Sequence, residues 1–119
     1  MAQTLHCLID LHLHLDGSLS AETARALAAM QGIELPRDAA ELDRMLHCPA
    51  GCRDLNEYLA CFTLPLSLLQ TGDALREAAR RLLTELADKG FLYAELRFAP
   101  QSHGQKGMSQ EQAIQAVLA

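Results

Sequence analysis

The sequence contains 119 residues, half of them hydrophobic, and carries a formal net charge of −5 at pH 7. This length suggests one domain. Acidic and basic residues are interspersed, without the basic stripe that is typical of a nucleic-acid surface. No uncharged apolar run is long enough for a transmembrane helix, and the first residues lack a signal-peptide pattern. We therefore expect a cytoplasmic protein without a nucleic-acid or membrane partner.

The elements are expected in the order strand, several helices, strand, helix. Residues 5–15 form a near-continuous apolar run that predicts a buried strand. Helices are predicted from Ser20 to Gln31, after the cap-like residues Asp38 and Asp54, and over residues 71–89. Pro65 is expected to kink or end the third of these helices. A second strand is predicted over residues 91–98, and a last helix after Ser109.

Two strands joined through helices indicate a parallel sheet with helices outside it. Two parallel strands do not make a stable sheet alone, and the sequence offers no third strand to cover them. We therefore interpret residues 1–119 as one N-terminal fragment of a larger single domain.

The four cysteines, Cys7, Cys48, Cys52 and Cys61, are too sparse for a disulfide scaffold. The spacing of Cys48 and Cys52 is suitable for a metal, but no second pair completes four ligands. We predict free thiols in a reducing compartment.

The most informative segment runs from His12 to Ser18 and reads H-L-H-L-D-G-S. Residues alternate faces along a strand, so Asp10, His12 and His14 are expected on one face. Two imidazoles about 7 Å apart along a strand can converge on one ion, and neutral imidazole is a common zinc ligand. A bare His-x-His pair is also common by chance, so this spacing alone does not identify a metal site.

The complete segment, entered from an apolar strand, resembles the opening strand of the adenosine deaminase family of metal-dependent amidohydrolases. Residues 92–100, L-Y-A-E-L-R-F-A-P, resemble the second barrel strand of its bacterial members. The resemblance covers essentially the whole chain. It implies an α/β fold, the N-terminal part of an eight-stranded (β/α)₈ barrel with a helical insert between its first two strands. Such a barrel needs about 250 residues, so this one would be incomplete.

The resemblance also implies roles for individual residues. His12 and His14 would be ligands of one zinc ion, and His14 and Asp16 would contact substrate, Asp16 through a ribose hydroxyl. The apolar stripe of the predicted third helix would act as a gate to the purine pocket, and ordinary helix core is an equally good interpretation of it. That stripe consists of Leu55, Tyr58, Leu59 and Phe62. Glu95 and Arg97 would point into the barrel, where we expect a structural polar network.

The implied activity is hydrolytic deamination of adenosine and deoxyadenosine in purine salvage, with inosine and ammonia as products and a zinc-activated water as the nucleophile. No catalytic acid or base of the family lies within these 119 residues. We therefore expect this chain alone to be inactive and to need the missing C-terminal barrel portion. Two alternatives remain open: a deaminase of adenine or another purine, and a non-catalytic remnant that binds metal or depends on a partner.

Overall fold

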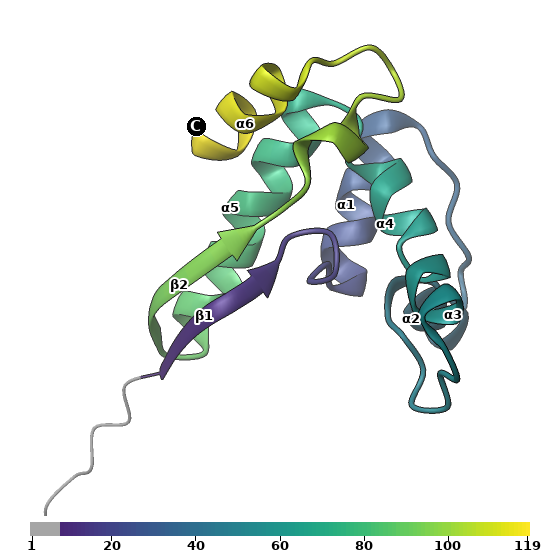
Figure 1. Ribbon diagram of the computed structural model, residues 1–119. Helices are drawn as coiled ribbons and strands as arrows, with labels where there is room; N and C mark the ends of the chain where they lie inside the picture. Colours follow the sequence, from purple (N-terminus) through teal and green to yellow (C-terminus); the bar gives the residue numbers. More distant parts are fainter. Residues whose placement is uncertain (1–7) are drawn as a thin grey trace, which may run out of the picture.

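The computed structural model describes residues 8–119, so the predicted start of the first strand, together with Cys7, lies outside the described residues. The strands β1 (Leu8–His14) and β2 (Phe91–Arg97) form a parallel pair. The chain passes between them through α1 (Ala21–Gln31), α2 (Ala39–Leu46), α3 (Leu55–Ala60), α4 (Thr63–Leu68) and α5 (Gly72–Asp88). A short 3-10 helix, η1 (Pro100–His103), and α6 (Gln110–Leu118) follow β2. Figure 1 shows the strand pair beside α5, with the shorter helices extending away from it.

Side-chain caps begin the helices where the sequence predicts them. The oxygen of Ser20 accepts a hydrogen bond from the backbone N–H of Thr23, and Asp38 and Asp54 cap α2 and α3 in the same way. Each cap satisfies a backbone donor that the first turn of a helix leaves free. In the part of the chain that the structure describes, no helix has both the length and the apolar composition needed to cross a membrane.

The predicted effect of Pro65 is wrong. α3 ends at Ala60 and α4 begins at Thr63, so the chain breaks at Cys61 and Phe62, and Pro65 lies in the first turn of α4. The first turn of a helix tolerates proline, because the N–H that proline lacks has no acceptor within the helix there. Pro65 is thus part of a helix start and not a helix end.

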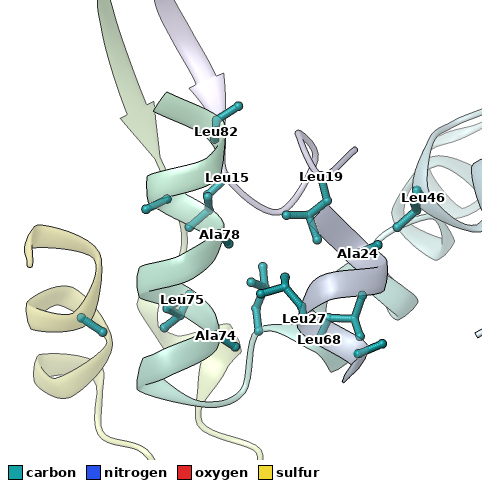
Figure 2. Close-up of a cluster of buried hydrophobic side chains, with 14 of the residues drawn as sticks. Leu15, Leu19, Ala24, Leu27, Leu46, Leu68, Ala74, Leu75, Ala78 and Leu82 are labelled. Carbon is teal, nitrogen blue, oxygen red and sulfur yellow. The ribbon is translucent and has the colours of Figure 1, made fainter. Parts of the chain in front are cut away.

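The hydrophobic core lies where the end of β1 meets the helices. Leu15 and Leu19, which follow β1, are buried with Leu27 of α1, Leu68 of α4 and Leu75 of α5. Figure 2 shows these side chains converging between α1 and α5. The buried core therefore fixes the chain directly after His14, which is the segment that carries the predicted site.

The strands themselves are more exposed than the sequence suggests. Ile9 and Leu11 of β1 are 58% and 52% exposed, and Leu92 of β2 is 74% exposed. Only Leu13 and Leu96 pack partly against the core. The prediction of a buried first strand is therefore wrong over most of β1, because the described residues provide helices to cover only part of a two-stranded sheet.

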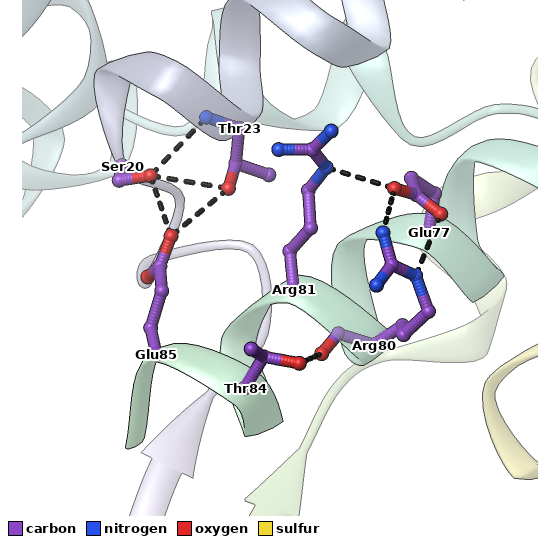
Figure 3. Close-up of polar contacts among 7 residues, drawn as sticks. All are labelled: Ser20, Thr23, Glu77, Arg80, Arg81, Thr84 and Glu85. Carbon is purple, nitrogen blue, oxygen red and sulfur yellow. Dashed lines mark hydrogen bonds and ion pairs between the residues drawn. The ribbon is translucent and has the colours of Figure 1, made fainter. Parts of the chain in front are cut away.

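A polar network joins the start of α1 to α5 (Figure 3). The hydroxyls of Ser20 and Thr23 both donate to Oε1 of Glu85, over 2.9 and 3.2 Å. About two turns earlier on α5, the carboxylate of Glu77 accepts from the guanidinium groups of Arg80 and Arg81. These contacts hold α1 against α5 and order the outer face of α5.

The contacts of Glu77 with Arg80 and Arg81 should make the contribution of Glu77 to stability depend on pH. Hydrogen bonds from Arg80 and then Arg81 lower the pKa of Glu77 from 4.5 to about 2. Because the folded pKa is lowered, the contribution is complete above pH 4.5 and disappears as the pH falls towards 2. Thermal unfolding should therefore show a lower Tm for Glu77→Gln at neutral pH, and the two melting curves should converge near pH 2. A Tm difference that is unchanged over this range would contradict this assignment.

Candidate metal centre and adjoining turn

The two predicted metal ligands lie together at the carboxyl end of β1. Nε2 of His12 and Nε2 of His14 are 3.0 Å apart, and their rings are 5.0 Å apart between centroids. His14 pairs with Arg97 of β2, and the backbone N–H of Leu15 donates to the Arg97 carbonyl over 2.8 Å. The strand pairing therefore fixes the backbone from which both imidazoles project.

This arrangement of nitrogens fits a shared cation. Zinc–nitrogen distances of 2.0–2.1 Å place two tetrahedral ligands about 3.3 Å apart, close to the separation found here. Two neutral imidazole nitrogens that face each other need either a proton or a cation between them. Within residues 8–119, however, no group of three or more His, Cys, Asp or Glu side chains forms a metal-binding cluster. Among the described residues, the pair therefore offers two candidate ligands for a metal ion and no third.

An irregularity in β1 changes the predicted alternation. The strands pair Asp10 with Ala94 and Leu13 with Leu96, so β1 uses one residue more than β2 over this stretch. Such a bulge redirects side chains and is frequent beside active sites. The carboxylate of Asp10 accepts a hydrogen bond from the backbone N–H of His12 over 3.0 Å. The simple alternation that groups Asp10 with both histidines is thus interrupted between Asp10 and Leu13.

The turn after β1 carries Asp16, which is half-buried. The hydroxyl of Ser18 donates to the His14 carbonyl over 2.5 Å, and the Ser18 N–H donates to Leu15 over 3.2 Å. This role of Ser18 was not predicted, although serine after Asp-Gly is a common turn signal. These two hydrogen bonds therefore close the turn from His14 to Ser18, which is the stretch that carries Asp16.

The predicted gate residues lie close to this turn. A Cβ added to Gly17 would lie 3.4 Å from Cε1 of Phe62, so the Phe62 ring covers the turn. The rings of Tyr58 and Phe62 meet edge to face, with centroids 5.3 Å apart. Leu55 and Leu59 are 67% and 52% exposed, and no residue of α3 is buried. The helix-core interpretation of the stripe is therefore wrong for the described residues, and the gate remains a prediction.

The polar residues of β2 form a smaller contact than the sequence suggests. The hydroxyl of Tyr93 donates to Oε1 of Glu95 over 3.0 Å, and this bond raises the pKa of Tyr93. Glu95 and Arg97 are exposed in the described residues. Glu95 thus has the hydrogen-bond partner that we expect, but neither Glu95 nor Arg97 is buried among the described residues.

A sequence model of one family, described as "Adenosine deaminase", matches residues 7–119. The chain belongs to the adenosine deaminase family. The match includes His12, His14 and Asp16 as well as all of the helical insert, and it confirms the family that the sequence motifs indicate.

Curated relatives agree with this membership. An adenosine deaminase of Haemophilus ducreyi is 54% identical over 111 residues, which cover 92% of this chain and 32% of that protein. An adenosine deaminase of Enterococcus faecalis is 43% identical over 110 residues, which cover 92% of this chain and 33% of that protein. The chain thus spans about a third of the length of the curated relatives it matches.

Solved structures show the same relation. An adenine deaminase from Arthrobacter aurescens superposes with a TM-score of 0.75 at 32% identity, over 92% of this chain and 33% of that chain. An Arabidopsis protein solved with GMP gives 0.69 at 25% identity, over 94% and 32%. The predicted fold class is confirmed: an α/β arrangement of two parallel strands and a helical insert that corresponds to part of a barrel deaminase.

Proposed function

We propose that this chain supplies part of the active site of an enzyme that hydrolyses adenosine and deoxyadenosine to the corresponding inosine nucleoside and ammonia. The observation that carries the proposal is the 3.0 Å approach of the two Nε2 atoms of His12 and His14 at the end of a family-matched strand. Purine salvage in the cytoplasm is the setting we propose. The thiols of Cys48, Cys52 and Cys61, which are all free, suit a reducing compartment.

In this proposal each residue near the turn has one task. His12 and His14 would hold a single zinc ion, which when bound supplies the Lewis acidity that activates water at neutral pH. Asp16 would accept a hydrogen bond from a ribose hydroxyl, with His14 close to the substrate. Phe62, packed over Gly17, and Tyr58 would exclude water from the purine pocket.

The chain alone is proposed to be inactive. A catalytic zinc usually has three protein ligands, whereas only two are grouped among the described residues. The family's proton-transferring glutamate and its other ligands are also not among these 119 residues. We therefore propose that residues 1–119 are one part of a single barrel domain and need the remaining portion for stability and turnover.

Zinc titration of the 119-residue chain tests the metal assignment. Ring proton signals of His12 and His14 in NMR spectra should shift together as Zn²⁺ is added, because both rings bind one ion. In His14→Ala, the zinc concentration needed for half of the His12 shift should rise at least about tenfold. Because the readout is specific to each residue, zinc bound by cysteines does not interfere.

His47→Ala is the matched control, since His47 is half-buried, hydrogen-bonds to Asp43 on α2 and is not one of the proposed ligands. It should leave the His12 and His14 shifts unchanged. Shifts of His12 and His14 that occur at different zinc concentrations would contradict the proposal that both rings bind one ion. Adenosine turnover that scales with chain concentration, survives purification and is lost in His14→Ala would contradict the proposed inactivity.

Adenosine is the favoured substrate within the family. The curated relatives at 40–54% identity carry the name adenosine deaminase, whereas a structural match at 32% is an adenine deaminase. In this proposal Asp16 contacts the ribose, which a free base lacks. A complete enzyme that contains this segment should therefore prefer adenosine, and a strong preference for adenine would overturn the choice.

The second candidate is a non-catalytic, partner-dependent remnant, and the exposed strand residues favour it. Ile9, Leu11 and Leu92 leave apolar surface uncovered in the described residues, and such a surface requires a partner. Sedimentation of the isolated chain separates the two candidates. A defined dimer with cooperative unfolding would support the remnant, whereas non-specific association that a supplied barrel portion abolishes would support the enzyme fragment.

A further inference from the structure

Three cysteines come together at the far end of the helical insert. Cys48 follows the end of α2, and Cys61 follows the end of α3. Between these helices the chain reverses in a turn closed by a 3.1 Å hydrogen bond from the Cys52 N–H to the Pro49 carbonyl. Cys48 and Cys52 therefore flank one turn, and Cys61 approaches from the neighbouring helix.

All three side chains are thiols and half-buried. Their sulfurs lie 3.6, 3.5 and 3.4 Å from backbone carbonyl oxygens, to which the S–H groups of Cys48, Cys52 and Cys61 donate. The neighbouring thiols, Cys52 more than Cys61, raise the pKa of Cys48 to about 12. The three groups thus form one thiol cluster centred on Cys48.

The cluster adjoins the turn of the predicted active site. Cys48 and Cys61 line a small cavity of about 90 Å³ whose wall also includes Gly17, Tyr58 and Phe62. Gly17 is next to Asp16, and Phe62 covers it. A chemical change at Cys48 therefore takes place in the wall of a cavity that the turn carrying Asp16 also lines, through Gly17.

Oxidation is the chemistry that this cluster suits. The described His, Cys, Asp and Glu side chains do not form a metal-binding group of three or more, so the thiols are not arranged as a metal site. Neighbouring, partly accessible thiols are instead the arrangement in which one cysteine resolves an adduct on another. Cys52 is the proposed partner of Cys48, because both flank the same turn, which the hydrogen bond from the Cys52 N–H to the Pro49 carbonyl closes.

We propose that Cys48 and Cys52 are a redox modification site that forms a reversible disulfide across the Pro49–Cys52 turn by exchange with a low-molecular-weight disulfide. The thiolate of Cys52 attacks one sulfur of that disulfide, whose S–S bond breaks and releases one thiolate. Cys48 then gives up its proton and attacks the Cys52 sulfur, which forms the new S–S bond and releases the second thiolate. The two protein thiols lose two electrons, and the external disulfide becomes two thiols that take up both protons.

The order of these steps follows from the cluster. Cys48 keeps its proton longest, so it serves as the resolving thiol and not as the first nucleophile. The product closes a ring of a few residues at the surface, and accessible, constrained disulfides are reduced readily. The modification is therefore reversible, and it fixes the loop that lines the cavity beside Phe62.

Peptide mapping after treatment with glutathione disulfide tests this site. Trypsin cleaves after Arg44 and Arg53, so Cys48 and Cys52 lie on one peptide, residues 45–53, whereas Cys61 lies on residues 54–76. The 119-residue chain should lose two titratable thiols. Peptide 45–53 should appear lighter by two hydrogen atoms and should regain them after treatment with dithiothreitol.

Cys7→Ser is the matched control variant and should give the same product in the same yield. Cys52→Ser should abolish the internal disulfide of peptide 45–53. The proposal is overturned if the main product links peptide 45–53 to peptide 54–76, if the cysteines carry only glutathione adducts, or if no thiol is lost. Each of these outcomes is distinguished by peptide mass alone.

Discussion

Replacement of His14 by alanine is expected to lower kcat/KM for adenosine by about a thousandfold in a chimeric enzyme, because His14 is a proposed zinc ligand and the loss of such a ligand costs about 4 kcal/mol of transition-state stabilisation. In this chimera, the present chain replaces the matched segment of the Haemophilus ducreyi relative, with which it shares 54% of residues. The expectation follows from the 3.0 Å approach of the His12 and His14 nitrogens. The measurement combines initial rates of adenosine deamination with zinc content per chain.

The matched control for this chimera is His47→Ala. His47 is half-buried and lines the small cavity beside Gly17, its Nδ1 is 3.0 Å from a carboxylate oxygen of Asp43, and it is not one of the proposed zinc ligands. This variant should retain its zinc content within about twofold, because it removes no proposed zinc ligand. A His14→Ala chimera with full zinc content and near-normal kcat/KM would show that His14 is not a ligand. If the unsubstituted chimera folds and binds zinc but deaminates no purine, the proposed function itself fails.

Replacement of His103 by alanine should lower the free energy of unfolding by about 2–4 kcal/mol. His103 is completely buried, its Nδ1 lies 2.8 Å from the Leu69 carbonyl, and its ring packs on Phe98 at 5.8 Å between centroids. A carbonyl only accepts, so Nδ1 carries the proton and donates it. The substitution thus leaves both a cavity and an unpaired buried carbonyl. Urea unfolding followed by circular dichroism measures the change.

His103→Asn is the informative second variant. Its side-chain amide donates from nearly the position of Nδ1, so it should preserve the bond to Leu69 and cost clearly less than alanine. Nε2 of His103 has no hydrogen-bond partner among the described residues, so its loss should add little. If the alanine and asparagine variants are equally stable, the bond to Leu69 does not hold η1 against the helices.

Local signals in the sequence were sufficient for much of this structure. Ser20, Asp38, Asp54 and Ser109 cap helices as predicted, because a cap depends on neighbours only a few residues away. Gly32, with φ of 67°, ends α1 for the same reason. The His12–His14 pair could also be found from sequence, since strand periodicity and the family motif indicate the same two residues.

Features that depend on distant partners could not be predicted. The extra residue between Asp10 and Leu13 is visible only against the register of β2. The contact of Phe62 with Gly17 joins positions 45 residues apart, and nothing in either segment signals it. The exposure of Ile9 and Leu92 has a similar origin, since apolar strands predict burial whether or not a covering layer is present.

These distant contacts are also what give the site its form. Core packing of Leu15 and Leu19 fixes the chain after β1, the Ser18 hydroxyl closes the turn, and Phe62 covers it. The thiol cluster around Cys48 adjoins the same turn through a shared cavity. The helical insert therefore connects the end of β1 that carries His12 and His14 to a region that the sequence alone presents as an ordinary loop.

A crystal structure of the zinc-loaded chimera, with anomalous diffraction data at the zinc absorption edge, tests the central claim most directly. The account predicts one zinc ion within about 2.0–2.3 Å of Nε2 of both His12 and His14. Zinc bound by Cys48, Cys52 and Cys61 instead, with none at the two histidines of an active chimera, would contradict it.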